Sequence, residues 1–454
     1  MELSEETSPD PPPWIGFRAG ELQIEGCSLP DLARRLPTPF FLVSERRLRA
    51  NYAALERGLS RAGDGAVLRY CAKTNCEAGV LEVLADCGSH LLASHAAEVT
   101  LALRCGFPAE RIAFARPGLA QPELDAVLAE GVQLVHVHQP QDMPLLEEAA
   151  ARAGRRVRLS LRLRGGASGL SPLRGLHRRH GLGPEEMLEA VSQAVASPWL
   201  EPFAVNFYLG TQQSSIAGFA RVFRGVLRLL ERIAGQTGVQ IKEVNLGGGI
   251  PSPTLRKVGP GDVWARWHDR LGNLDAPAGN HRNEDVAARL AEKFRELVAQ
   301  ARLASPPVLT AEPGRAVVGN AALLITRVQG RRGRWLFLDA SRAFLPESSL
   351  LFARRILPLR ESPEAPTFLH LSGSTLNTLD VLDFHRRLPP LGAGDGLAFC
   401  DAGAYSISRA ARYAGLPPAV YLLQENGQVR PIRRAEGVDD LAGPMLFRRG
   451  GAGA

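Results

Sequence analysis

The chain has 454 residues, of which 45% are hydrophobic and 22% are charged, and its formal net charge at pH 7 is +7. This length allows more than one domain, and the composition is ordinary for a globular protein. No apolar run approaches the roughly 18 residues of a membrane-spanning helix. Aromatic residues make up only 6% of the chain, and no nucleic-acid-binding motif accompanies the arginines. We therefore expect neither a membrane nor a nucleic-acid partner.

The N-terminal stretch and the cysteines indicate the compartment. The segment "MELSEETSPDPPPW" is acidic and Pro-rich and lacks the basic-then-apolar pattern of a signal peptide. The 6 cysteines are scattered, without a CxxC pair or the spacing of metal ligands. Such cysteines are typical of a reducing compartment, so we expect a cytoplasmic protein and no metal site. Residues 1–13 and 448–454 are predicted to be mobile ends.

Residues 14–39 have strand character and are predicted to join a β-rich domain that later residues build. Beyond them, apolar runs typical of strands alternate with helical patterns. In chain order the runs are "VLRYCAK", "HLLAS", "IAFAR", "LVHVH", "VRLSLRL", "FAVNFYLG", "EVNLGGG" and "VLTAEP". Glycines stand where the early intervening helices should end, at Gly88, Gly106, Gly131 and Gly154.

This alternation favours a parallel sheet covered by helices. About eight strand–helix units in roughly 250 residues match the size of a closed (β/α)8 TIM-type barrel, which we assign to residues 40–315. The alternative is an open, doubly wound sheet. Past this region, strand-like runs are separated by turn residues without long helices. Residues 316–447 are therefore predicted to form a β-rich barrel or sandwich domain.

Two long segments interrupt the alternation, after the fifth and the seventh predicted strands. They read "RGGASGLSPLRGLHRRHGLG" and "PSPTLRKVGPGDVWARWHDRLGNLDAPAGNHRNED". Both lie on the side of the barrel where barrel enzymes carry their chemistry. Each segment is either a lid or substrate wall, or an irregular surface loop.

Reactive residue types collect at the C-terminal ends of the predicted strands, which converge on one mouth of a barrel. These ends carry Lys73, the segment 208–211, the triple glycine Gly247, Gly248 and Gly249, and the segment 312–315. A glycine turn lets backbone N–H groups approach an anion, and the last two strands of such barrels often hold a phosphate. Each signal is weak alone, but their placement at strand ends makes the combination specific.

The lysine points to the chemistry, because the basic charge of this chain is carried mostly by arginine. An arginine keeps its proton in a protein, whereas a desolvated lysine can lose it and act as a nucleophile. A nucleophilic lysine, a phosphate-binding turn and a buried acid together fit pyridoxal 5'-phosphate. Lysine binds this cofactor covalently, and a carboxylate opposite the pyridine nitrogen keeps that nitrogen protonated. A protonated ring favours decarboxylation at Cα.

With these motifs in order, the sequence resembles the fold-type III pyridoxal-phosphate decarboxylases. This family includes the diaminopimelate, ornithine and arginine decarboxylases and shares the barrel of alanine racemase. The motifs that carry the resemblance are "YCAKTN", "AERIAFARPGLAQPEL", "FYLGTQ", "LGGG", "EPGR" and "DAGAY". The similarity extends from "TPFFLVSERRLRANYAAL" near the front to "DAGAYSIS" near the end. This chain is identified as a divergent member of the family.

The resemblance implies a role for each matched residue. Lys73 would bind the cofactor covalently and Glu312 would pair with the pyridine nitrogen, while Tyr208 replaces the histidine that usually stacks on the ring. The expected phosphate-side ligands are Thr211, Gly247, Gly248, Gly249, Gly314, Arg315 and the hydroxyl of Tyr405. The family works as a homodimer in which each active site is completed by the partner's β domain, so a homodimer is expected here.

The departures from the family concern the substrate. The family motif Gly-Pro-x-Cys-(Glu/Asp)-x-x-Asp corresponds to "GSTLNTLD". Its cysteine, which protonates Cα, falls on Leu376, its first acid falls on Asn377, and only Asp380 matches as a catalytic acid. Leucine cannot donate a proton, so Thr375, Cys400 or an ordered water would have to do so.

The residues that would bind the distal end of the substrate differ as well. The Arg-Pro segment that grips the distal carboxylate of diaminopimelate reads "LPESS", residues 345–349, so we do not expect meso-diaminopimelate to be the substrate. Glu347 or Asp380 would bind a distal amine. Arg174, Arg178 and Arg179 would instead suit a larger acidic conjugate.

Three functions therefore remain. The first is a decarboxylase of an amino acid or amino-acid conjugate that uses pyridoxal 5'-phosphate. The second keeps the cofactor but changes the outcome to racemisation, elimination or decarboxylation-dependent oxidation, because Leu376 and Tyr208 differ from the family. The third is a non-catalytic homologue, which would not need to keep the cofactor-binding residues.

Overall fold

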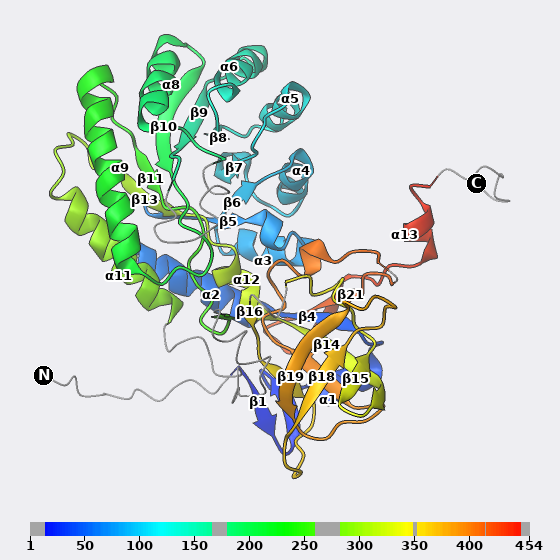
Figure 1. Ribbon diagram of the computed structural model, residues 1–454. Helices are drawn as coiled ribbons and strands as arrows, with labels where there is room; N and C mark the ends of the chain where they lie inside the picture. The colour runs from blue at the N-terminus through cyan, green and yellow to red at the C-terminus, as the bar shows by residue number, and fades with distance from the viewer. Residues whose placement is uncertain (1–13, 166–178, 259–281, 348–351, 414, 446–454) are drawn as a thin grey trace, which may run out of the picture. The chain divides into compact units, whose positions relative to one another are not determined.

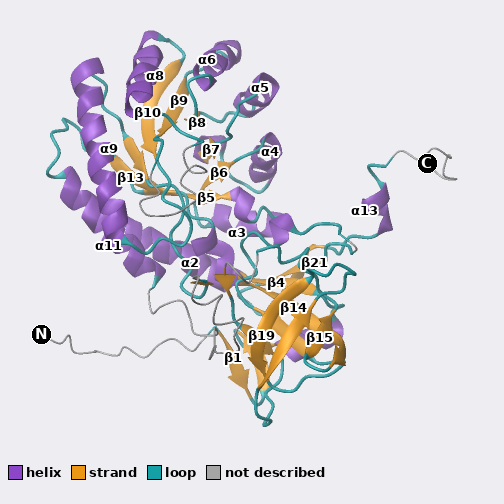
Figure 2. Cartoon of the chain, in the orientation of Figure 1, coloured by secondary structure: helices purple, strands orange, loops and turns teal. Residues whose placement is uncertain are grey.

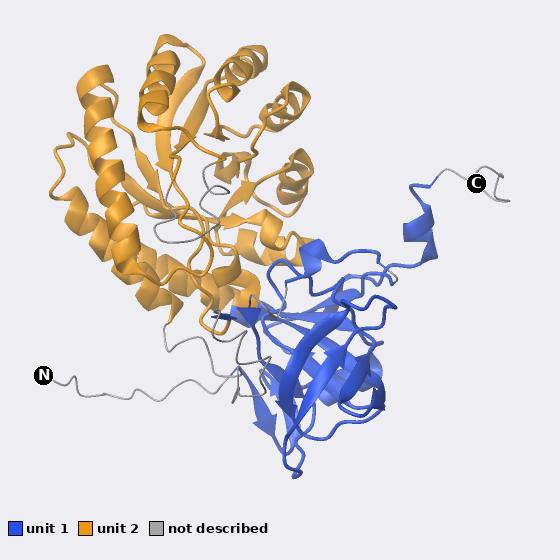
Figure 3. Cartoon of the chain, in the orientation of Figure 1, with its two compact units in different colours: residues 1–47, 256–277, 321–454 blue, residues 48–255, 278–320 orange. Residues whose placement is uncertain are grey.

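The structure is a computed structural model that describes residues 14–165, 179–258, 282–347, 352–413 and 415–445 (Figure 1). The chain divides into two compact units (Figure 3). The barrel unit comprises residues 48–255 and 278–320, and the β unit comprises residues 1–47, 256–277 and 321–454. The predicted mobile ends lie outside the described residues.

The barrel unit contains a closed barrel of parallel strands, so the predicted fold class is confirmed. Every apolar run identified in the sequence becomes one of its strands. They are β5 (Val67–Cys71), β6 (His90–Ala93), β7 (Ile112–Phe114), β8 (Leu134–Val137), β9 (Val157–Arg162), β10 (Leu200–Asn206), β11 (Glu243–Asn245) and β13 (Val308–Ala311). β13 pairs with β5, which closes the barrel and excludes the open doubly wound sheet.

Helices alternate with the strands along the chain and form the outer layer of this unit (Figure 2). They are α2 (Glu45–Leu59), α3 (Ala78–Asp86), α4 (Ala96–Arg104), α5 (Gln121–Ala129), α6 (Asp142–Ala153), α8 (Pro184–Ala196), α9 (Ile216–Thr237) and α11 (Asn283–Val298). In α9, Phe219, Phe223, Val226 and Leu230 are buried at helical spacing. Gly154 ends α6 with a left-handed φ of 62°, as its position in the sequence predicted. Among the described residues, no helix is long and apolar enough to span a bilayer.

Alternate residues of the strands meet inside the barrel. Cys71, Leu92, Ala113 and Leu134 form one buried cluster, although they come from four successive strands. Nearby, Arg69 of β5 pairs with Glu243 of β11 at 2.9 Å, and both are buried. These two strands are separated by β13, so the pair must cross the inner face. The barrel interior therefore carries polar side chains as well as an apolar layer.

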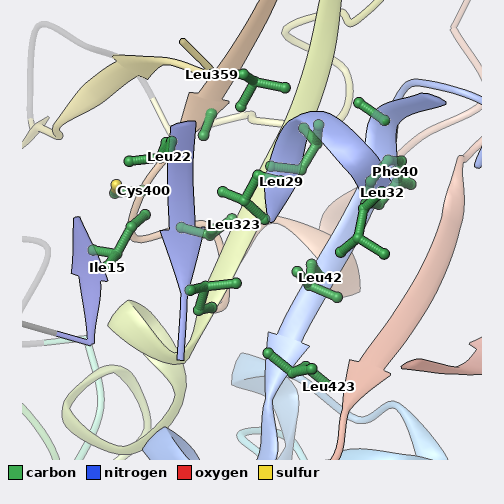
Figure 4. Close-up of a cluster of buried hydrophobic side chains, with 14 residues drawn as sticks. Ile15, Leu22, Leu29, Leu32, Phe40, Leu42, Leu323, Leu359, Cys400 and Leu423 are labelled. Atoms are coloured by element: carbon green, nitrogen blue, oxygen red, sulfur yellow. The ribbon is translucent and has the colours of Figure 1, made fainter. Parts of the chain in front are cut away.

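The β unit is built from mostly antiparallel strands, with parallel pairs between β4 and β21 and between β15 and β18, and from short connections. Its elements are β1 (Ile15–Arg18), β2 (Glu21–Ile24), β3 (Cys27–Ser28), α1 (Leu29–Arg35), β4 (Phe40–Ser44), β12 (Arg256–Lys257), β14 (Ala322–Arg332), β15 (Trp335–Leu338), β16 (Phe352–Ala353), β17 (Ile356–Pro358), β18 (Thr367–Ser372), β19 (Val381–Leu388), β20 (Gly396–Phe399), β21 (Ala419–Leu423), β22 (Val429–Arg433) and α13 (Val438–Ala442). The N-terminal residues Ile15, Leu22 and Leu29 pack with Leu323 and Leu359 in its core (Figure 4).

The unit boundaries differ from those expected from the sequence. We placed residue 40 at the start of the barrel, but β4 pairs antiparallel with β14 and parallel with β21. All five residues of β4 are buried, and a wholly apolar strand looks the same in a barrel and in a covered sheet. At the other boundary, α12 (Arg315–Val318) and the turn that follows it stay in the barrel unit as far as Asn320.

Candidate active site

Lys73 lies directly after β5, in a short 3-10 turn formed by Ala72–Thr74. Its side chain is exposed, whereas Ala72 and Thr74 on either side are buried. The Cys71 N–H donates to the carbonyl oxygen of Pro313 at 3.2 Å, and a Cβ added to Gly314 would overlap the Thr74 hydroxyl. The lysine turn and the segment 312–315 therefore lie side by side at one end of the barrel.

The triple-glycine turn after β11 is held tightly by its neighbours. The Glu312 N–H donates to the Gly247 carbonyl oxygen at 2.9 Å, and the Gln213 N–H donates to that of Gly249 at 2.8 Å. A Cβ on Gly248 would lie 2.9 Å from the carbonyl oxygen of Glu312, and one on Gly249 would overlap the carbonyl oxygen of Gly210. The turn is thus a side-chain-free cradle in which backbone groups can approach an anion. This geometry fits the phosphate of pyridoxal 5'-phosphate.

Tyr208 and Thr211 lie in the segment that follows β10, and both are half-buried. The Tyr208 ring borders the glycine turn, with Cε2 about 3.5 Å from where a Gly249 side chain would begin. The guanidinium carbon of Arg162 lies 5.8 Å from the centre of the same ring, close enough for a cation–π contact. An aromatic ring therefore stands beside the anion cradle, where a flat cofactor could stack.

Glu312 is the buried acid of the site. Its Oε1 lies 3.2 Å from Nε2 of His136 and accepts a hydrogen bond of 2.6 Å from Nδ2 of Asn245. Burial raises the pKa of Glu312, but the charge of His136 and Arg69 and the Asn245 hydrogen bond outweigh it and lower the pKa to about 2. The carboxylate is therefore ionised at neutral pH, as required of a group that holds a protonated ring nitrogen.

Sequence reasoning missed His136 and Asn245. Both stand inside strand-like runs that were treated only as structure, in "LVHVH" and "EVNLGGG". A signal existed, because polar residues at alternate positions of an otherwise apolar strand all face the same side. In a barrel that side is the interior. His136 lies on β8 and His138 directly follows this strand, and both side chains are buried.

The remaining predicted residues belong to the β unit. Asp380 is buried, and its Oδ2 accepts from Thr375 Oγ1 at 2.6 Å and from Thr375 N–H at 3.0 Å, while Oδ1 accepts from Arg342 N–H at 2.8 Å. Asp380 thus organises its own loop, on which Leu376 is fully exposed. Tyr405 is half-buried, with φ of 55°. The roles of Asp380 and Tyr405 toward substrate and cofactor remain predictions.

The structure also bears on Cys400 as a possible proton donor and on the residues expected to bind the substrate. Cys400 lies in the apolar core of the β unit, where burial raises the pKa of its thiol to about 12. A thiol in this environment is poorly suited to donate a proton to substrate, so Cys400 is a weak candidate for the missing acid. Arg174 and Arg178 lie outside the described residues, as do Ser348 and Ser349, whereas Arg179 is exposed.

Comparison with known proteins identifies the family. The family model for "Pyridoxal-dependent decarboxylase, pyridoxal binding domain" matches residues 47–319. A diaminopimelate decarboxylase from Aquifex aeolicus is 26% identical over 98% of this chain and 100% of its own length. A lysine/ornithine decarboxylase from Selenomonas ruminantium is 25% identical, covering 93% of this chain and 98% of the relative.

Solved structures agree in fold. The diaminopimelate decarboxylase from M. jannaschii, crystallised with L-lysine, superposes with a TM-score of 0.82 at 21% identity, covering 95% of this chain and 98% of the other. The structure of SrLDC in complex with PLP and cadaverine gives a TM-score of 0.70 at 22% identity, covering 88% of this chain and 93% of the other.

The comparisons also bear on the functions left open by the sequence. They support a decarboxylase and give no support to racemisation, elimination, oxidation or a non-catalytic role. The names of the relatives do not support our expectation that meso-diaminopimelate is not the substrate. The cradle, the buried carboxylate and the matched domain agree: this chain belongs to the pyridoxal-dependent decarboxylase family and is an amino-acid decarboxylase that uses pyridoxal 5'-phosphate.

Proposed function

We propose that this enzyme decarboxylates an amino acid or amino-acid conjugate other than meso-diaminopimelate, with Lys73 and Glu312 as its central cofactor-binding residues. The observation that carries the proposal is the shared location of the lysine turn, the glycine cradle and the ionised Glu312 at one end of the barrel. When bound, the cofactor withdraws electrons from Cα as the carboxylate leaves. The residues of the protein bind the cofactor, orient the substrate and supply the proton that replaces the carboxylate.

Lys73 is proposed to bind the cofactor covalently. Its exposed side chain follows a strand end, and the adjacent Cys71 and Pro313 backbones hold its turn against the segment that carries Glu312. A primary amine in this position can react once it has lost its proton, which an arginine could not do.

The phosphate is proposed to lie against backbone rather than side-chain groups. Gly247, Gly248 and Gly249 supply a cradle that any Cβ would fill. The other proposed ligands are Thr211, Gly314, Arg315 and Tyr405. Backbone N–H groups bind an anion without losing side-chain entropy, which favours a tightly held phosphate.

The substrate part of the proposal rests on the loop of residues 373–380. Leu376 occupies the place of the family's proton-donating cysteine and Asn377 that of its acid. Asp380, which matches the final acid, already accepts hydrogen bonds from Thr375 and Arg342. The distal carboxylate or amine of a substrate would therefore meet different groups in this loop from those that the family motif supplies. Decarboxylation of meso-diaminopimelate is the second candidate, because several relatives carry that name.

The oligomeric state and the cellular location of the enzyme are also proposals. We infer a homodimer in which the β unit of each chain completes the partner's active site, as the family resemblance implies. The exposed Leu376 and Leu379 on the loop that contains the motif support this, since exposed apolar side chains commonly mark contact surfaces. A cytoplasmic location is proposed from the scattered free cysteines.

The test is a substrate panel with purified enzyme carrying pyridoxal 5'-phosphate. Released CO2 and the mass and chirality of the product are measured for meso-diaminopimelate, L-lysine, L-ornithine, L-arginine and acidic amino-acid conjugates. The proposal predicts that one of the other substrates gives a higher kcat/KM than meso-diaminopimelate. If meso-diaminopimelate is the best substrate, the second candidate is correct.

A further inference from the structure

Two buried side chains approach the same oxygen of Glu312. Nε2 of His136 lies 3.2 Å from Oε1, and Nδ2 of Asn245 donates to Oε1 at 2.6 Å. The exposed fractions of His136, Asn245 and Glu312 are 1%, 1% and 7%. The three come from β8, β11 and the end of β13, which closure of the barrel brings together. Neither contact involves Oε2 of Glu312. His136 and Asn245 therefore leave this second oxygen for another partner.

The chemistry of the neighbours determines how His136 carries its proton. A carboxylate oxygen can only accept, so a lone pair on Nε2 facing it at 3.2 Å would be repelled. The imidazole therefore presents an N–H to Glu312 from Nε2. Among the described residues, Nε2 makes no hydrogen bond of good geometry, so His136 acts on Glu312 mainly through its nearby positive dipole or charge.

Asn245 connects Glu312 to the glycine cradle. The Gly247 N–H donates to Oδ1 of Asn245 at 2.8 Å. Because an N–H can only donate, the amide oxygen must face Gly247, which leaves the amide nitrogen for Glu312. One buried amide therefore links the acid proposed for the ring nitrogen to the turn proposed for the phosphate.

The neighbours of Glu312 lower its pKa, whereas burial of the carboxylate raises it. An isolated carboxylate in a barrel interior would tend to take up a proton, because a neutral group costs less to bury. The positive groups facing Glu312 are His136 from β8, Arg69 from β5 and Arg162 from β9. Together with the Asn245 hydrogen bond, they keep the carboxylate ionised and make it a weak base.

We propose that His136 and Asn245 are positioning residues that make Glu312 a carboxylate too weakly basic to take the proton from the cofactor's ring nitrogen. By engaging Oε1 they leave Oε2 for the nitrogen, and by stabilising the anion they keep the shared proton on the ring. This inference rests on the proposed role of Glu312. Without these donors, the low-dielectric interior would favour the neutral pair, in which the glutamate carries the proton.

The experiment measures the position of that proton directly. Enzyme is loaded with pyridoxal 5'-phosphate labelled with ¹⁵N in the ring, and the ¹⁵N chemical shift is recorded at neutral pH. We expect a protonated nitrogen in the wild-type enzyme and a shift toward the unprotonated value in His136→Leu. His136→Gln, whose amide nitrogen takes the place of Nε2 and can still donate, should retain more of the protonated signal. His90→Leu is the matched control, because His90 begins β6 at the opposite end of the barrel strands.

Asn245→Ala provides the second variant. It should move the ¹⁵N signal in the same direction and also weaken cofactor binding about tenfold, because it releases the Gly247 N–H of the cradle. His136→Leu should move the signal with a smaller loss of cofactor affinity. If His136→Leu fails to fold, as judged by circular dichroism, His136→Gln and Asn245→Ala still decide the question.

The outcomes separate this inference from the proposed function. A wild-type protein that binds no pyridoxal 5'-phosphate would overturn the proposed function. A bound cofactor with an unprotonated ring in the wild type would overturn the role of the two positioning residues and the pairing of Glu312 with a protonated nitrogen, but not cofactor binding or decarboxylation. A protonated ring whose ¹⁵N signal is the same in the wild type and in all three site variants would overturn only the role of the two positioning residues.

Discussion

The carbonyl oxygen of Gly210 occupies the space that a side chain on Gly249 would need. Gly249 also has a φ of 97°, in the left-handed region that other residues rarely adopt. Steric overlap with backbone cannot be relieved by rotating a side chain. The loop after β10 and the glycine turn after β11 therefore fit together only if residue 249 is glycine.

Gly249→Ala should push the glycine turn away from Gly210 and weaken binding of pyridoxal 5'-phosphate by at least about tenfold, with a loss of stability of about 1–3 kcal/mol. Cofactor titration followed by absorbance, together with chemical denaturation, measures both. Gly225→Ala is the matched control, because Gly225 lies in α9 with no atom near the added Cβ. That change should stabilise by about 0.5–1 kcal/mol. Unchanged cofactor affinity in Gly249→Ala would contradict the proposed cradle.

Lys73→Ala should abolish the covalent attachment of the cofactor, because no other group replaces a primary amine at this turn. The measurement is the visible absorbance of the bound cofactor before and after borohydride, followed by mass spectrometry of the reduced protein. Lys242→Ala is the control, since Lys242 is an exposed lysine that pairs with Glu201 at 2.7 Å. A reducible band that survives in Lys73→Ala would show that another lysine binds the cofactor.

His138 should make stability depend on pH. Burial, with further contributions from His136, Arg162 and His180, lowers the pKa of His138 from 6.5 to about 3. The folded state thus binds the proton less tightly than the unfolded state. Its contribution is fully present above pH 6.5 and is lost as the pH falls toward 3, with a slope of at most about 1.4 kcal/mol per pH unit.

Urea denaturation of the wild type and of His138→Gln between pH 4 and 7 tests this sign. The free energy of unfolding should decline less steeply with falling pH in the variant, because the glutamine does not titrate. His90, whose pKa is also lowered by burial, to about 4, is present in both proteins and cancels in the comparison. Parallel curves for the two proteins would argue against a buried neutral His138.

Asp380→Asn should destabilise the β unit by about 1–3 kcal/mol, because an amide cannot accept from Thr375 and Arg342 on both of its atoms. Thermal and urea unfolding measure the loss. Asp439→Asn, at an exposed position of α13, should change stability by less than about 0.5 kcal/mol. If Asp380→Asn instead loses activity while its stability is unchanged, the catalytic role implied by the family motif is supported.

Leu376→Cys should restore a proton donor at the family's position and raise the rate of amine formation at least about tenfold. Leu379→Cys is the matched control, since it adds a thiol to an exposed leucine of the same loop. Both variants are assayed with the best substrate of the panel. Equal rates in the two variants would show that position 376 does not reach the substrate.

Much of the fold could be predicted because its signals are local. The apolar runs of the barrel strands, such as "VLRYCAK" and "VRLSLRL", needed only their length and the helical patterns between them. The unit boundary at β4 could not be predicted in the same way, because Phe40–Ser44 is apolar on both faces. Its partners β14 and β21 are hundreds of residues away, and only their register decides which sheet it joins.

The residues of the candidate site also differ in whether a local sequence signal indicates them. Lys73, the triple glycine and Glu312 could be found because each follows a strand and carries an unusual residue type. The contribution of His136 could not, because a histidine within an apolar strand is just as consistent with a satisfied core residue. Its meaning depends on Glu312 lying 3.2 Å away across the barrel.

The sequence alone therefore determined the barrel, the β-rich part, the cofactor and the residues that end each strand, since periodicity and turn chemistry act over a few neighbouring positions. The tertiary structure decided that Asn245 joins Glu312 to the glycine cradle, that His136 faces the same carboxylate, and that Asp380 binds its own loop. Such contacts depend on strand register and barrel closure, which bring distant residues within hydrogen-bonding distance and which no local pattern encodes.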